Sequence, residues 1–390
     1  MKKFAAVVAA GAMAATAAWS IDAVKADDAV VVGGAVALSG FIAPYDDPHK
    51  GAILAIDELN AAGGVLGKQI KWVAADTKSD PAQGANAAIE VLEQGAQLVI
   101  VTCDYDFGSP AAITAQSRGV MSFSLCAGDP KFGVQGIGDL AFTMGIGTPG
   151  EGAIMAEWAH DQGWSKPFIL KDTQVEYTKK LANYFQARWE DGLGTITGQD
   201  TFNGQTDTNA AGQITRIKES GADFIVFTGA AGIGGAGFLK QIRAAGIDIP
   251  VIGGVAMDGV YWLDAIPGLS NFYNLNYSSI HGDDPIPAVQ DFWAAYSEKF
   301  GAPIVGFSVT GYAIIQAWAR AAERAGTFDS AAVADELEKF NGEPLLVGAT
   351  TFTEEWHINF HTPMALTQVQ GGKRSAVGRF SPGKVPPVDF

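Results

Sequence analysis

The sequence predicts an α/β protein made of two lobes, each built on a doubly wound parallel sheet. Short apolar strand-like runs alternate with amphipathic helical runs from residue 29 to 125, and the same alternation restarts after a break near residues 145–150. Strand–helix–strand alternation implies parallel strands joined by crossover helices. A chain of 390 residues with 48% apolar residues is long enough to bury two separate cores.

The first series contains four strands and three helices. Ile53, Ile56 and Leu59 have helical spacing, with Gly63 as a stop signal, and Pro81 suits the first turn of the next helix. The expected strands are 29–38, 69–76, 98–102 and 120–125, and the expected helices are 51–62, 81–94 and 111–118.

The second series repeats this order. Its expected helices are 150–161, 178–189, 210–220 and 238–245, and its expected strands are 167–171, 195–202, 224–227 and 251–253. Later helices at 287–300, 308–324 and 330–340 and strands at 350–352 and 365–370 fit either lobe by pattern alone. The Pro-rich end, 381–390, is expected to be a loose tail.

The N-terminus predicts export. Lys2 and Lys3 precede an uncharged, Ala-rich apolar run at 4–19, and small residues at 24–26 suit cleavage of a signal peptide. A membrane anchor is the alternative, but the run is shorter than the roughly 20 residues that span a bilayer. We therefore expect residues 1–26 to be a signal peptide and the mature protein to be periplasmic.

The net charge of −16 argues against two classes of partner. An acidic surface repels phosphate backbones and anionic lipid headgroups, so neither nucleic acid nor a membrane surface is expected as a partner. The chain has two cysteines, Cys103 and Cys126. In an oxidising compartment such a pair suggests a disulfide.

Several segments, taken together, carry a family resemblance. They are Val36–Gly40, Asp57–Gly67, Asp76–Pro81, Gly221–Phe224, Gln241–Gly246 and Gly311–Ala313. Their order and spacing resemble the type I periplasmic binding proteins of branched-chain amino acid importers, from about residue 29 to 372. The resemblance implies two lobes joined by three crossings, as in a venus flytrap, with a ligand in the cleft at the carboxyl ends of the strands.

The resemblance also divides the chain and implies a site. The expected N-terminal lobe is 27–147 and 278–350, and the expected C-terminal lobe is 148–277 and 351–390. The candidate ligand-binding residues are Phe41, Tyr45, Asp104, Tyr105, Asp106, Cys126, Ala127, Tyr177, Ala230, Asp258 and Phe307. Tyr105 and Tyr177 match family ligand positions, and Asp258 is the candidate acid for a ligand ammonium.

The chain departs from the family at the site. Asp104 and Asp106 replace a Ser-rich turn that holds a carboxylate in the family, and Ala127 replaces a Thr. Two acids disfavour an anionic group, which weakens the case for a standard aliphatic amino acid. The aromatic candidates, with Trp262, suit a flat solute, so an aromatic or other carboxylic acid or an amide is the alternative ligand.

Cys103 and Cys126 end the third and fourth strands, which are neighbours in the family fold. This arrangement implies a Cα separation within disulfide range. A disulfide beside the cleft and two buried free thiols both remain open at this point.

A second function comes from Gly232–Gly237, which fits G-x-G-x-x-G between a strand and a helix, with Asp258 about 20 residues on. An exported NAD-dependent oxidoreductase is therefore the alternative from another class. His357 and His361 are four apart, but in turn or strand they would lie about 13 Å apart, so no metal site is expected. The favoured prediction is a monomeric, non-catalytic and cofactor-free substrate-binding component of an ABC importer, which passes a small amino-acid-like or related solute to a permease.

Overall fold

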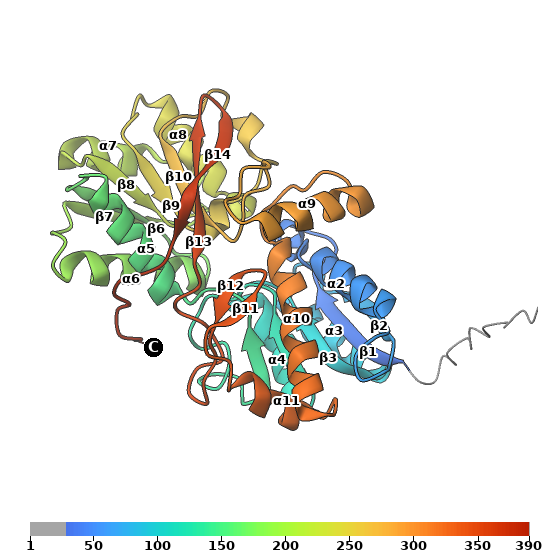
Figure 1. Ribbon diagram of the computed structural model, residues 1–390. Helices are drawn as coiled ribbons and strands as arrows, with labels where there is room; N and C mark the ends of the chain where they lie inside the picture. The colour runs from blue at the N-terminus through green and yellow to red at the C-terminus, as the bar shows by residue number, and fades with distance from the viewer. Residues whose placement is uncertain (1–28, 390) are drawn as a thin grey trace, which may run out of the picture.

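The computed structural model describes residues 29–389 and shows two α/β lobes, each with its own sheet (Figure 1). The N-terminal lobe has a five-stranded sheet in the order β2-β1-β3-β4-β5, and all of its strands are parallel. The C-terminal lobe has a seven-stranded sheet in the order β14-β13-β10-β9-β8-β6-β7, in which β13 and β14 run antiparallel to their neighbours. The prediction of two parallel-sheet lobes is confirmed. The expected signal peptide lies outside the described residues.

The N-terminal lobe combines early and late parts of the chain. Its strands are β1 (Val30–Val36), β2 (Ile70–Asp76), β3 (Ala96–Val101), β4 (Met121–Ser124) and β5 (Ala141–Thr143), with a hairpin of β11 (Glu343–Leu345) and β12 (Gly348–Thr350). Its helices are α1 (Ala43–Asp46), α2 (His49–Ala61), α3 (Pro81–Glu93), α4 (Tyr105–Ser117), α9 (Pro287–Phe300), α10 (Ser308–Ala325) and α11 (Ser330–Leu337).

The C-terminal lobe contains the middle and the end of the chain. Its strands are β6 (Pro167–Asp172), β7 (Gly198–Phe202), β8 (Phe224–Phe227), β9 (Val251–Gly253), β10 (Phe272–Asn276), β13 (Met364–Gln370) and β14 (Lys373–Phe380). Its helices are α5 (Thr148–Asp161), α6 (Glu176–Glu190), α7 (Ala211–Ser220) and α8 (Gly235–Ala244), with 3₁₀ turns at Ala231–Ile233, Val255–Met257 and Leu263–Ala265. Among residues 29–389, no helix combines the length and the apolar character that crossing a bilayer requires.

The chain crosses between the lobes three times: after β5, after β10 and before β13. The segment after β12 still packs on the N-terminal lobe. The Phe352 ring lies 5.3 Å from that of Phe142, and His357 stacks on Phe142 at 3.7 Å. The sequence-based division placed these residues in the C-terminal lobe, because nothing local in this short segment shows which core its rings fill.

A close helix crossing attaches the late helix α10 to the N-terminal lobe. A Cβ on Gly51 of α2 would lie 1.9 Å from the carbonyl oxygen of Ser308, and a Cβ on Gly311 of α10 would lie 1.9 Å from that of Pro48. Only glycine permits this approach, because the two backbones touch where a side chain would stand. The resemblance implied this placement of the late helices, and the structure has it.

Helix α4 begins earlier than predicted, and this matters for the site. The sequence predicted this helix over residues 111–118. In the structure Pro110 lies inside the helix, and Asp104 is the N-cap, accepting a 2.8 Å hydrogen bond from the backbone N–H of Asp106. Proline costs a helix the hydrogen bond to the carbonyl four residues earlier, but it does not prevent an N-cap from starting the helix upstream.

Candidate ligand-binding site

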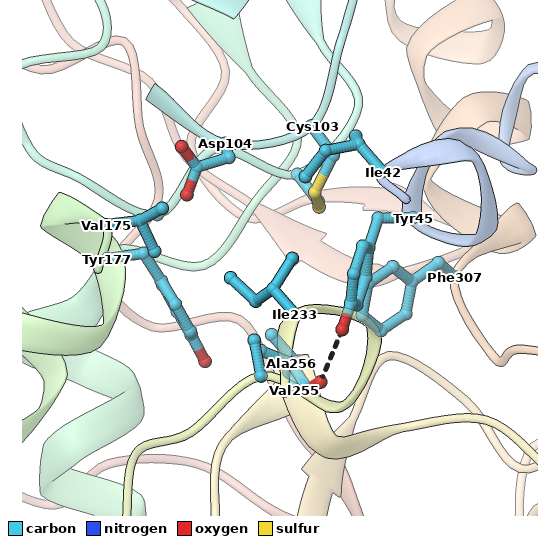
Figure 2. Close-up of a pocket in the computed structure, with 13 residues that line it drawn as sticks. Ile42, Tyr45, Cys103, Asp104, Val175, Tyr177, Ile233, Val255, Ala256 and Phe307 are labelled. Atoms are coloured by element: carbon cyan, nitrogen blue, oxygen red, sulfur yellow. Dashed lines mark hydrogen bonds between the residues drawn. A yellow bond between two sulfur atoms is a disulfide. The ribbon is translucent and has the colours of Figure 1, made fainter. Parts of the chain in front are cut away.

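A cavity lies between the two lobes, where loops after the strands of both sheets meet (Figure 2). From the N-terminal lobe and its crossings it is lined by Ile42, Tyr45, Cys103, Asp104, Cys126, Gly128 and Phe307. From the C-terminal lobe it is lined by Val175, Tyr177, Ala230, Ile233, Val255 and Ala256. Most of these residues closely follow a parallel strand, which is where open α/β sheets bind ligands.

The cavity is small and largely apolar. Its volume is about 50 Å³, which is small beside the roughly 300–1,000 Å³ of typical ligand pockets. Aliphatic and aromatic side chains form most of its wall, with the Tyr45 and Phe307 rings 6.0 Å apart on one side. Such a site fits a compact organic molecule with an apolar body.

Tyr45 joins the lobes across this cavity. Its hydroxyl donates a 2.9 Å hydrogen bond to the carbonyl of Ala256, drawn as a dashed line in Figure 2, and accepts one of 2.9 Å from the N–H of Gly232. Burial raises the pKa of Tyr45 to about 12, so the hydroxyl keeps its proton at neutral pH. Both partners belong to the C-terminal lobe, so this side chain holds the lobes in a closed arrangement.

A second pair of contacts closes the rim. The carboxylate of Asp106 accepts a 2.8 Å hydrogen bond from the backbone N–H of Glu176, at the start of α6. The Nζ atom of Lys131, in the N-terminal lobe, lies 3.7 Å from the Glu176 carboxylate. The negative Asp106 also suits the positive N-terminal end of α6. These contacts involve the first turn of α6, which contains the cavity residue Tyr177.

A buried acid positions the wall on the C-terminal side. The Tyr177 hydroxyl donates a 2.9 Å hydrogen bond to Oε1 of Glu151, and the N–H of Val255 donates one of 2.7 Å to the same oxygen. Burial raises the pKa of Glu151 to about 7. Its other oxygen, Oε2, has no hydrogen-bond partner among the described residues. Glu151 therefore ties together two residues that line the cavity.

Asp104 is the acidic side chain of the cavity lining. One carboxylate oxygen, Oδ1, accepts the capping bond from Asp106. Its backbone has a φ of 85° and a ψ of 144°, a conformation that costs residues other than glycine conformational free energy. Burial, followed by repulsion from Asp106, raises the pKa of Asp104 to about 8.

Cys103 and Cys126 form a disulfide in the structure, with their Cα atoms 4.7 Å apart. The bridge joins the ends of β3 and β4 and lies in the cavity wall. It therefore fixes the spacing of the two loops that contribute Asp104 and Gly128.

Six of the predicted site residues line the cavity. They are Tyr45, Asp104, Cys126, Tyr177, Ala230 and Phe307. Each follows a strand or flanks a helix start in the loops that the resemblance pointed to.

Four other predicted residues lie nearby but outside the lining. Phe41 is 37% exposed and packs edge-on against Phe107. Tyr105 and Asp106 lie in the first turn of α4, not in a loop, which directs Tyr105 toward Phe132 and Asp106 toward the rim. Ala127 is fully buried behind the wall.

Asp258 is also outside the lining. Its Oδ1 lies 3.1 Å from Nη1 of Arg374, and its Oδ2 accepts a 2.5 Å hydrogen bond from the N–H of Gly306. Both side chains are buried. Arg374 belongs to β14, a strand that the sequence did not predict, so the sequence offered no sign that this acid is already paired. The expectation that Asp258 meets a ligand ammonium does not fit this geometry.

The dinucleotide alternative does not fit the geometry either. Gly232 contacts Tyr45, and a Cβ on Gly234 would lie 1.8 Å from the carbonyl oxygen of Gly204, so these glycines serve close packing. The acid expected to bind a ribose, Asp258, is paired with Arg374. A cavity of about 50 Å³ has no room for a dinucleotide.

Several lining residues were not predicted from the sequence. They are Ile42, Gly128, Val175, Ile233, Val255 and Ala256, while Cys103 was predicted only as a disulfide partner. Small and aliphatic residues carry no chemical signal by themselves. Their position beside predicted residues, in the same loops, is the signal that could have identified them.

Comparison with known proteins identifies the family. The family model described as periplasmic binding protein matches residues 29–374. The Leu/Ile/Val-binding protein homolog 3 of Brucella melitensis is 28% identical over 324 residues, which cover 81% of this chain and 85% of that protein.

Solved structures agree. The branched-chain amino acid transporter substrate-binding protein LivJ of Streptococcus pneumoniae, in complex with isoleucine, has a TM-score of 0.78 and 26% identity, covering 91% of this chain and all of that one. A solute-binding protein from R. palustris in complex with benzoate shares the fold at 19% identity, with a TM-score of 0.71, covering 91% of this chain and 97% of that one. The chain belongs to the periplasmic binding protein family.

Proposed function

We propose that this protein is the periplasmic substrate-binding component of an ABC importer, and that it captures one small amino-acid-like molecule in the interlobe cavity. The observation that carries the proposal is a largely apolar cavity whose wall comes from both lobes, at the carboxyl ends of their strands. Because the wall is divided between the lobes, a ligand contacts all of it only when the lobes are closed.

The relatives support a compact organic solute. LivJ is in complex with isoleucine, and two R. palustris solute-binding proteins that share the fold are in complex with benzoate and 4-hydroxybenzoate. All three ligands are small and carry an apolar body. The apolar wall of this cavity suits a molecule of the same kind.

The proposed mechanism is a shift between open and closed forms. A ligand that contacts both lobes binds the closed form more tightly and so raises its population. The Tyr45 and Asp106 contacts across the cleft stabilise that form. A permease in the inner membrane would then recognise the closed protein. We propose no catalysis, since Tyr45, Tyr177 and Asp104 already serve to hold the wall.

Thermal unfolding and X-ray scattering test the proposal on the mature protein. A ligand present at 100 times its Kd stabilises the native state by about 2.7 kcal/mol, which for this size raises the Tm by roughly 3–4 °C. We expect one class within a panel of amino acids, amines, amides and aromatic acids to do this and to reduce the radius of gyration. A panel without any effect on either quantity would contradict the proposal.

A further inference from the structure

We infer that the cavity binds a small organic cation, a protonated amine with a compact apolar body, through the carboxylate of Asp104, and that its ligand is not held by a carboxylate. The inference rests on the proposed function and narrows its ligand class. It would make the ligand amino-acid-like in its amine and its side chain, but without the acid group.

The charges around the cavity favour a cation. The lining residues include one acid, Asp104, and no Lys, Arg or His. Asp106, Asp129 and Glu176 lie close enough to raise the pKa of Asp104 further. The nearby cations are directed at other acids: the Nζ of Lys131 lies 3.7 Å from both the Asp129 and the Glu176 carboxylates, and Lys179 also pairs with Glu176. A positive ligand meets a negative field here, and a negative ligand is repelled.

The position that would hold a ligand carboxylate is already filled. The N-terminus of a helix that follows a strand is a ready site for an anion. At α4 this place belongs to the Asp104 carboxylate, which accepts the N–H of Asp106. The lining contains no Ser or Thr hydroxyl, and the hydroxyls of Tyr45 and Tyr177 already donate to Ala256 and Glu151.

Asp104 has capacity for a ligand. Its Oδ1 accepts the capping bond, whereas Oδ2 accepts no hydrogen bond from the described residues. Figure 2 shows Asp104 on the same side as Val175 and Tyr177, with Tyr45 and Phe307 on the opposite side. An ammonium at Asp104 therefore leaves the apolar body of the ligand facing the Tyr45 and Phe307 rings.

A matched series of head groups tests the inference. The probes are benzylamine, benzamide, benzyl alcohol and benzoate, with isopentylamine and leucine as an aliphatic pair, measured by calorimetry at pH 8. We expect benzylamine and isopentylamine to bind, and we expect benzoate and leucine not to bind. Asp104→Asn keeps the shape and an oxygen for the cap, but it should weaken amine binding about 10- to 100-fold, as expected for the loss of a charged hydrogen bond.

Asp80→Asn is the matched control. Asp80 is also a helix N-cap, accepting from the N–H of Ala82, but it is exposed and outside the cavity. This variant should bind amines as the unmodified protein does. Between pH 6 and pH 8 amine affinity should rise, because Asp104 must lose its proton to pair with the cation.

Three outcomes would count against the inference. If benzoate, leucine or the neutral probes bind and the amines do not, the inference is wrong while the proposed function stands. If Asp104→Asn binds amines with unchanged affinity, Asp104 is not the recognition group. If no head group binds at millimolar concentration and scattering shows no closure, both the inference and the proposed function fail.

Discussion

The hydroxyl of Tyr45 lies 2.9 Å from the carbonyl oxygen of Ala256, although 211 residues separate them in sequence and they belong to different lobes. The same hydroxyl accepts the N–H of Gly232. The Tyr45 side chain therefore has two roles. It lines the cavity that would contact a ligand, and it connects the two lobes in the closed form.

Removing this bridge should speed ligand release. Tyr45→Phe leaves the Ala256 carbonyl and the Gly232 N–H without their partner, at a net cost of about 0.5–1.5 kcal/mol for each hydrogen bond. We expect the dissociation rate to rise about 5- to 150-fold, measured by stopped-flow fluorescence. Tyr184→Phe, which removes a hydroxyl bonded to Asp389 within the C-terminal lobe, is the control. Equal rates in both variants would contradict the bridge.

Stability should fall as the pH rises through the neutral range. Burial raises the pKa of Glu151 from 4.5 to about 7, so the folded protein binds a proton that the unfolded chain has released. Between these two pH values the native state binds more protons than the unfolded state, and the free energy of unfolding decreases with pH, by about 3 kcal/mol at most for this group.

Urea unfolding at pH 5 and pH 8 measures this decrease. Glu151→Gln keeps an oxygen for Tyr177 and Val255 but cannot ionise, so its stability should depend less on pH. A pH dependence identical to that of the unmodified protein would show that Glu151 is not the responsible group.

Breaking the buried ion pair of Asp258 and Arg374 should destabilise the fold. Asp258→Asn leaves the Arg374 charge buried without its counter-ion, which costs about 3–5 kcal/mol. We expect a lower denaturation midpoint, and a partial recovery when Arg374→Met is added. If Asp258 were instead a ligand acid, the variant would keep its stability and lose affinity.

Reduction should also destabilise the protein. The Cys103–Cys126 bridge closes a loop of sequence separation 23, for which the chain-entropy estimate is about 3 kcal/mol. A reducing agent should therefore lower the denaturation midpoint of the unmodified protein. The double variant Cys103→Ser with Cys126→Ser should have the lower midpoint from the start and no response to reductant. If the denaturation midpoint of the unmodified protein is the same with and without reductant, this expectation is wrong.

Local sequence patterns predicted most of the helices and strands. They did not predict segments in which apolar residues lack a regular helical or strand spacing. Strand β8 (Phe224–Phe227) and helix α9 (Pro287–Phe300) have the predicted bounds. Strand β14 was missed because it is an edge strand with exposed polar side chains. Helix α4 was expected to begin at residue 111, whereas it begins at Tyr105 and contains Pro110.

Six of the residues that line the cavity were predicted from the sequence, and the others were not. Tyr177 and Phe307 could be predicted because they follow recognisable segments of the chain. Tyr105 and Asp258 could not be judged correctly, because a residue's neighbours in sequence do not show where its side chain is directed or which charge it meets. For Asp258 that charge, Arg374, is 116 residues away.

The two-lobe α/β plan could be predicted from the chain alone, because hydrophobic periodicity and turn residues are local properties of each segment. Which acid lines the cavity depends on how the chain packs, because Asp258 pairs with Arg374, whereas no Lys, Arg or His is among the described residues that line the cavity with Asp104. Electrostatic pairing depends on distances in space, and these are set by how the two sheets and their loops pack.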